Sequence, residues 1–175
     1  MKAIPEKTKF TRFPVVSLSA EYLVMGHLMR RNILTYKAPP NNEGYDLICI
    51  HPDPRKATRQ IRVQVKSRLA SDSDRGFPVK ARTIAAFDFL VVVFLNVGNF
   101  FSKARRSAGR KGAREPEFYT FPASFIRTHH DARSSWEKVR TRGLDIEAFK
   151  NESGFEQIAK ILEIEYPTKL LNDGA

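Results

Sequence analysis

The sequence predicts an α/β or α+β domain in which a central mixed β-sheet is flanked by helices. Three observations lead to this fold class. Apolar residues recur at helical spacing over 18–29, polar and apolar residues alternate over 60–68, and 89–95 is apolar throughout. An alternating strand has one solvated face, whereas an uninterrupted apolar strand is buried on both faces. A sheet that contains both kinds of strand needs helices against it.

The first helix is expected to begin at Ser17 or Ser19, whose side chains can cap it, and to end near Arg31. Asn32 follows two arginines and suits the left-handed conformation that often ends a helix. Helical spacing predicts that the apolar face of this helix comprises Leu18, Tyr22, Met25, Leu28 and Met29, with Val24 beside them.

A short strand over 33–38 is followed by the clearest feature of the chain, an antiparallel hairpin with strands over 45–51 and 60–68. With the turn centred near residues 55 and 56, paired residue numbers add up to about 112. Asp46 then faces Lys66, and Ile48 faces Gln64. Directly opposed side chains lie about 5 Å apart, so Asp46, Gln64 and Lys66 are predicted to share one site.

Downstream, the sequence predicts a helix over 79–87, a buried and perhaps parallel strand over 89–95 and a short strand over 117–121. Pro122 suits the first turn of a following helix. A last helix, stopped at Pro167, carries apolar residues at helical spacing: Phe155, Ile158, Ile161 and Leu162.

No repeat and no long Gly/Ser linker divides the 175 residues, which are expected to form a single domain. Its motif-bearing core covers about 17–121, and a C-terminal helical part covers about 122–166. The only cysteine, Cys49, is expected to be buried. The N-terminus lacks an apolar signal core and the longest apolar run is too short to span a membrane, so a cytoplasmic protein is expected.

The positive charge is concentrated in one part of the chain. Residues 51–114 hold fifteen Lys/Arg and four Asp/Glu, a net of +11, which equals the net charge of the whole protein. Within this stretch, 103–114 has six cations in twelve residues and is expected to be a mobile loop. Such clustering is typical of proteins that bind polyanions. The alternatives are a solvated basic face and, less favoured, a membrane surface, because no apolar helical stripe accompanies the cations.

A carboxylate, an amide oxygen and a lysine at one end of a sheet suit a hard cation bound to a phosphate. Mg²⁺ prefers oxygen ligands and keeps several waters, one of which can ionise to the nucleophile. A neighbouring lysine can position that water or neutralise charge on the phosphate.

Glu21 on the first helix, Gly44-Tyr45-Asp46-Leu47 opening one strand and Gln64-Val65-Lys66 closing the next resemble the PD-(D/E)XK nuclease superfamily. This superfamily includes restriction endonucleases, archaeal Holliday-junction resolvases and some homing endonucleases. The resemblance covers about residues 17–95.

The resemblance implies a restriction-endonuclease-like sheet and a DNA endonuclease that depends on Mg²⁺ or Mn²⁺. Asp46 matches the metal-binding aspartate, Lys66 the catalytic lysine, and Glu21 the helix carboxylate that helps to bind metal or water. The metal would be held by Asp46, Gln64, Val65 and Glu21. Gln64 stands where the superfamily usually has Asp or Glu, which removes one negative charge and weakens metal binding. Glu43 is a reserve carboxylate near Asp46.

Two groups of basic residues are expected to contact DNA phosphates. One follows the second strand of the hairpin and the other lies in the basic loop: Arg68, Arg75, Lys80 and Arg82, then Lys103, Arg105, Arg106, Arg110, Lys111 and Arg114. Cutting both strands of a duplex commonly takes two active sites, so a homodimer is expected by analogy.

Other residues that could suggest metal ligands or a base-stacking surface are interpreted as having structural roles. The literal Pro52-Asp53 pair lies in the hairpin turn, roughly 20 Å from Lys66 along the second strand, so Asp53 is rejected as a metal ligand. The run 129–131 (His-His-Asp) is interpreted as a polar turn, because zinc needs four converging ligands. Trp136 is interpreted as a packing residue.

Three functions are compatible with these patterns. The first is the metal-dependent endonuclease, and the second is a DNA-binding module on the same fold with an eroded metal site. The third is an RNA-binding accessory protein without nuclease ancestry, which a sheet lacking the pairing of Asp46 with Lys66 would favour.

Overall fold

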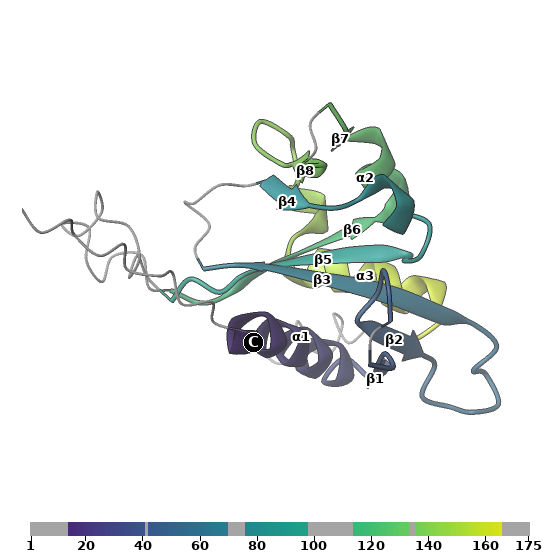
Figure 1. Ribbon diagram of the computed structural model, residues 1–175. Coiled ribbons are helices and arrows are strands. Elements are labelled where there is room, and N and C mark those ends of the chain that lie inside the picture. Colours follow the sequence, from purple (N-terminus) through teal and green to yellow (C-terminus); the bar gives the residue numbers. More distant parts are fainter. Residues whose placement is uncertain (1–13, 41, 70–75, 98–113, 134–135, 166–175) are drawn as a thin grey trace, which may run out of the picture.

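A five-stranded mixed β-sheet forms the centre of the computed structural model, which describes residues 14–40, 42–69, 76–97, 114–133 and 136–165 (Figure 1). The spatial order is β1-β2-β3-β5-β6. β3 and β5 run parallel and the other neighbours are antiparallel. The predicted fold class is therefore confirmed. The strands are β1 (Leu34–Lys37), β2 (Leu47–Ile50), β3 (Gln60–Arg68), β5 (Phe89–Phe94) and β6 (Glu117–Pro122).

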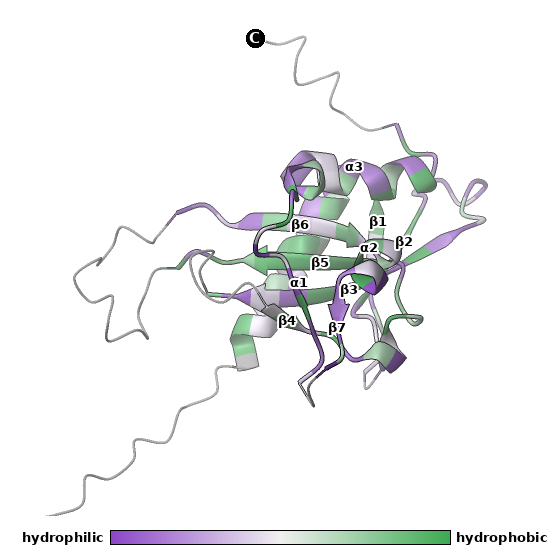
Figure 2. Ribbon diagram, turned by 90° about the horizontal axis from the view of Figure 1, so that it is seen from above, coloured by the Kyte–Doolittle hydropathy of each residue, from purple (hydrophilic) through white to green (hydrophobic). Residues whose placement is uncertain are grey.

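β5 is the buried centre of this sheet, and Figure 2 colours it hydrophobic along its length. All six of its residues are buried, as the uninterrupted apolar run predicts. Alternate side chains enter two separate cores, with Val91 and Val93 on one face and Leu90 and Val92 on the other. Because both faces are covered, every position of the strand can be apolar.

Helices α1 (Pro14–Met29) and α3 (Asn151–Ile161) cover one face of the sheet (Figure 1). The predicted apolar face of α1 is wrong in most positions. Ala20, Val24 and Leu28 are fully buried and Met25 is partly buried, whereas three predicted residues are exposed: Leu18, Tyr22 and Met29. Apolar residues occur almost all round this helix, so their spacing does not select one face.

The other face is covered by a second, three-stranded sheet, which was not predicted. Its order is β4 (Gly76–Pro78), β8 (Lys138–Arg140) and β7 (His130–Asp131). The C-terminal part, expected to be helical, thus supplies two strands besides α2 (Ala123–Thr128), the 3₁₀ turn η4 (Glu147–Phe149) and α3.

The helix predicted over 79–87 is also wrong. Only the 3₁₀ turn η1 (Ala81–Thr83) forms there. The backbone N–H of Val79 donates to the carbonyl of Glu137 at 3.2 Å, and that of Ala81 donates to the Glu137 side chain. These bonds tie the segment to the second sheet, so its donors are used outside a helix.

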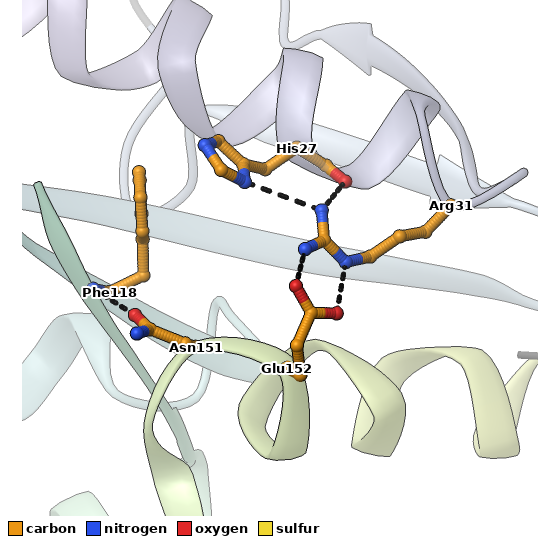
Figure 3. Close-up of polar contacts among 5 residues, drawn as sticks. All are labelled: His27, Arg31, Phe118, Asn151 and Glu152. Carbon is orange, nitrogen blue, oxygen red and sulfur yellow. Dashed lines mark hydrogen bonds and ion pairs between the residues drawn. The ribbon is translucent and has the colours of Figure 1, made fainter. Parts of the chain in front are cut away.

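A buried arginine joins α1 to α3 (Figure 3). The side chain of Arg31 is 6% exposed and forms a double hydrogen bond with the carboxylate of Glu152. Its Nη1 also donates to the carbonyl of His27 at 2.6 Å, and the guanidinium lies 5.0 Å from the centre of the Phe155 ring. Asn151 accepts the backbone N–H of Phe118 at 3.0 Å, which fixes the start of α3 on β6.

Several smaller predictions are confirmed. Asn32, in the turn that follows α1, has a positive φ of 61°. Cys49 is fully buried beside Thr35. The alternation of β3 buries Ile61, Val63 and Val65. The prediction that Trp136 is a packing residue is wrong, because 68% of its surface is exposed. Among the helices described here, none has the length and apolar character needed to cross a membrane.

Candidate functional site

A hollow of about 390 Å³ lies between the loop before β2, the end of β3 and the segment that follows β4. Asp46, Gln64 and Lys66 all line it, so the three predicted residues do lie at one site. The remaining lining residues are Asn42, Glu43, Gly44, Pro78, Val79, Lys80, Thr83 and Phe87.

The hairpin register differs from the prediction by two positions. Leu47 is paired with Val63 and Ile48 with Arg62, so paired numbers add up to 110. Asp46 therefore continues this register opposite Gln64, and Lys66 lies one step further along the same face. A register shift of two residues leaves every side chain on the same face of the sheet, so Asp46, Gln64 and Lys66 still share one face despite the error.

The loop before β2 brings Asp46 to this position. Gly44 has a φ of +104°, a conformation that side-chain-bearing residues rarely adopt, and an added Cβ would collide with Ala86. Asn42 Nδ2 donates to the carbonyl of Tyr45 at 2.8 Å, which closes the turn. The backbone N–H of Asp46 donates to the carbonyl of Val63 at 2.8 Å. The carboxylate is thus anchored at the edge of the hollow.

The Asp46 carboxylate completes the hydrogen bonding of β3 where β2 has ended. Its Oδ2 accepts the backbone N–H of Val65 at 2.7 Å and also a hydrogen bond from Gln64 Nε2. Gln64 Nε2 lies 3.4 Å from the carbonyl oxygen of Val65 as well. The Asp46 carboxylate and the Val65 carbonyl therefore converge on one electropositive group, the side-chain amide nitrogen.

Two lysines face the hollow without a neutralising acid. No described carboxylate lies within 4.0 Å of the ammonium group of Lys66 or Lys80. The backbone of Lys80 is fixed, because its carbonyl accepts the backbone N–H and the hydroxyl of Thr83, each at 2.9 Å. Of the two carboxylates in the hollow, Glu43 pairs with Arg82, so Asp46 and the two lysines leave a net positive charge that suits an anionic ligand.

Glu21 does not line this hollow. Its carboxylate pairs with Lys37 of β1. Lys37 is the register partner of Leu47, whose side chain is buried in the core beneath α1. Alternation along the chain therefore puts Lys37 and Asp46 on opposite faces of the sheet. Glu43 does line the hollow, and its carboxylate pairs with Arg82 at 2.7 Å.

The predicted DNA-contacting residues lie in different surroundings in the structure. Lys80 lines the hollow and Arg82 is exposed beside it. Arg68 instead points inward, donating to the carbonyl of Gly76 with its guanidinium 5.3 Å from the Phe77 ring centre. Arg114 pairs with Glu117 at 3.0 Å. The others lie outside the described residues: Arg75, Lys103, Arg105, Arg106, Arg110 and Lys111.

The structural interpretation holds for Asp53, but the polar turn predicted at 129–131 is wrong, because His130 and Asp131 form β7. Asp53 pairs with Arg55 at 2.9 Å in the hairpin turn. His130 Nε2 lies 2.8 Å from the carbonyl oxygen of Val79 and so holds β7 against the wall of the hollow. Within the ranges that the structure describes, no group of three or more His, Cys, Asp or Glu side chains could hold a metal ion. A cation at the hollow would need amide and carbonyl oxygens in addition to Asp46.

Comparison with known protein families finds no match to this chain. Curated proteins likewise include no match. Four chains of solved structures match, and one of them is a bacterial homing endonuclease, I-Ssp6803I. The match covers 87% of this chain and 95% of that chain, with 14% sequence identity and a TM-score of 0.49. The functional assignment therefore rests on the geometry of the hollow.

Proposed function

We propose that this protein is a Mg²⁺-dependent endonuclease that hydrolyses DNA phosphodiester bonds at the hollow lined by Asp46, Gln64 and Lys66. One observation above all supports the proposal. The Asp46 carboxylate and the Val65 carbonyl share the amide nitrogen of Gln64 as a common positive partner. Two oxygens that converge in this way, beside an unpaired lysine, suit a hard cation and a phosphate.

The donor atoms fit Mg²⁺ or Mn²⁺. The ligands would be the Asp46 carboxylate, the Gln64 amide oxygen and the Val65 carbonyl, all hard oxygen donors, with water in the remaining positions. When bound, such an ion polarises the phosphate and lowers the pKa of a bound water. With only one carboxylate among these donors, metal affinity is expected to be low.

Lys66 is the proposed catalytic residue. Its side chain follows Gln64 by two positions on the same face of β3 and has no described acid to neutralise it. An ammonium group there can orient the attacking water or offset the negative charge that builds on the phosphate. Glu21 is left out of the proposed site, because its ion pair with Lys37 lies on the face of the sheet opposite Asp46. Cutting a duplex in both strands would need two such sites, and we include a homodimer in the proposal.

The test is incubation of the purified protein with supercoiled, single-stranded and branched DNA in Mg²⁺, Mn²⁺ or EDTA. Cleavage is expected with either cation and not in EDTA. Asp46→Ala and Lys66→Ala should each abolish it. Asp53→Ala and Lys56→Ala are matched controls, since they remove the same groups from the hairpin turn, and both should cut normally.

Cleavage that persists in both Asp46→Ala and Lys66→Ala would place the activity at another site or in a contaminant. Equal loss in all four variants would mean that the substitutions act through folding. Circular dichroism and thermal unfolding of each variant separate these cases.

A second function is favoured by one observation: Asp46 is the only carboxylate among the proposed ligands, because Glu43 of the hollow pairs with Arg82. A DNA-binding module with an eroded metal site would bind DNA in a salt-sensitive manner without cutting it. Asp46→Ala would then leave the affinity unchanged or raise it slightly. Loss of cleavage without loss of binding in that variant would instead support the endonuclease.

A further inference from the structure

Basic residues form a row on β8, in the third of the chain where acids outnumber bases. Residues 115–175 contain eight Lys/Arg and eleven Asp/Glu. Val139 and Thr141 are nevertheless buried, and the residues that alternate with them point outward. These outward residues are Lys138, which is half-buried, and Arg140 and Arg142, which are exposed. β8 thus sorts Lys138 and Arg140 onto the outer face of the second sheet, and Arg142 lies in the turn that follows the strand.

The row starts at the rim of the hollow. Lys138 is the register partner of Pro78, and Pro78 lines the hollow next to Lys80. Arg140 is the register partner of Gly76, so the row leads away from the rim along β8. Trp136, two residues before Lys138, is 68% exposed. An anion in the hollow would therefore meet further positive charge along β8.

Nearby acids make their hydrogen bonds and ion pairs with other groups. Asp131, opposite Lys138, forms a double hydrogen bond with Arg133, and this bond, with a smaller contribution from the charge of Arg140, holds the pKa of its carboxyl far below the usual range. The Glu137 carboxylate accepts the backbone N–H of Ala81 instead. Within the described ranges, no carboxylate forms an ion pair with the three cations of the row.

We propose that the outer face of β8 binds the sugar–phosphate backbone of DNA beside the hollow, through Lys138, Arg140 and Arg142. This inference rests on the proposed function, since it extends the path of the same substrate. Alternate residues of a strand are about 6.7 Å apart, so Lys138 and Arg140 match roughly two phosphate steps along one strand of a duplex, and Arg142 extends the row from the following turn. Trp136 lies where an exposed aromatic ring can stack on a base.

The test is DNA binding in EDTA, measured by fluorescence anisotropy over a range of salt concentrations with single-stranded and duplex oligonucleotides. The variant K138Q/R140Q/R142Q is compared with K56Q/R59Q/R127Q. This control removes three exposed cations elsewhere and gives the same net charge. The double variant R140Q/R142Q serves if the triple variant fails to fold.

The β8 variant should bind at least about tenfold more weakly at about 0.1 M salt, and the slope of log affinity against log salt should fall by about 2 to 3. The control should stay within about twofold of the wild type. Equal weakening in both variants, an unchanged slope, or no DNA binding by the wild type would each overturn the inference.

Cleavage separates this inference from the proposed function. If the wild type cuts DNA, the β8 variant should have a raised KM and an unchanged kcat. An unchanged KM would overturn the inference alone. Binding that depends on β8 without any cleavage would overturn only the proposed function. Trp136 is the only tryptophan, so its fluorescence should be quenched in step with the anisotropy. Saturated binding with unchanged fluorescence would place the DNA elsewhere.

Discussion

The side-chain nitrogen of Gln64 donates a hydrogen bond to Oδ2 of Asp46, directly across the end of the β2–β3 hairpin. An amide nitrogen cannot ligate a metal, because its lone pair is delocalised and its hydrogens point at the acceptor. The amide must therefore rotate and present its oxygen when a cation binds. This rotation links metal binding to a side-chain change that can be observed.

Gln64→Glu is predicted to bind Mn²⁺ more tightly by about tenfold or more, because a second carboxylate adds a negative charge to the ligand set. Isothermal titration calorimetry measures this affinity. Gln60→Glu is the matched control, since it makes the same change at the exposed start of β3 and should leave the affinity unchanged. Equal gains in both variants would show that Mn²⁺ responds to net charge rather than to this site.

Lys66→Ala is predicted to slow single-turnover cleavage by roughly 10² to 10³, the usual effect of removing one group that stabilises the transition state. Mn²⁺ affinity should stay within about threefold, because the lysine is not a ligand. Quenched-flow kinetics with Mn²⁺ at saturation measure the rate. A variant that regains full rate at higher Mn²⁺ would assign Lys66 to metal binding instead.

Glu152→Gln is predicted to lower the free energy of unfolding by about 2 kcal/mol, because it leaves the buried Arg31 without its counter-charge. Glu156→Gln, on the same helix, breaks a more exposed pair with Lys160 and should cost no more than about 0.5 kcal/mol. Urea unfolding followed by circular dichroism compares the two. Equal effects would mean that the tie between α1 and α3 contributes little.

His27 is predicted to make stability depend on pH. Burial first, and then the charge of Arg31, lower its pKa below the ordinary 6.5. As the pH falls below 6.5, the unfolded chain takes up a proton before the native state does, so stability is lost on acidification and is unaffected above that value. Urea unfolding between about pH 7 and pH 5 should show a smaller loss in His27→Gln. Identical pH profiles would contradict this role.

Cys49 is predicted to be unreactive in the native state. Burial raises the pKa of its thiol to about 12, so almost no thiolate is present near neutral pH. A thiol reagent such as dithiobis(nitrobenzoic acid) should modify it only at the rate at which the protein unfolds. Fast modification in native buffer, independent of added denaturant, would show that the strand pair opens locally.

The sequence predicted the central sheet well because β3 and β5 have unambiguous patterns. Ile61, Val63 and Val65 alternate with polar residues on β3, and β5 is apolar at every position. The face of α1 was not predictable from spacing, since the small Ala20 rather than Tyr22 lies against the sheet. Apolar residues all round a helix leave that choice to tertiary packing.

The sequence predicted which residues form the site, but not how the two strands of the hairpin pair. The hairpin loop is asymmetric, because the Asp53 carboxylate holds a turn in which the N–H of Lys56 donates to the Asp53 carbonyl at 2.9 Å. This moves the centre of the hairpin toward β2. The β8 row was not predicted, because acids elsewhere in 115–175 give that segment a net negative charge, and only the folded sheet separates Lys138 and Arg140 from the buried Val139.

Anomalous scattering from crystals grown or soaked with Mn²⁺ would locate the metal in the hollow. One peak is expected within about 2.5 Å of Asp46 Oδ2, with the Gln64 amide rotated to present its oxygen and Lys66 alongside. A peak that avoids Asp46, or an unchanged bond from Gln64 to Asp46 at saturating Mn²⁺, would contradict the proposed metal site.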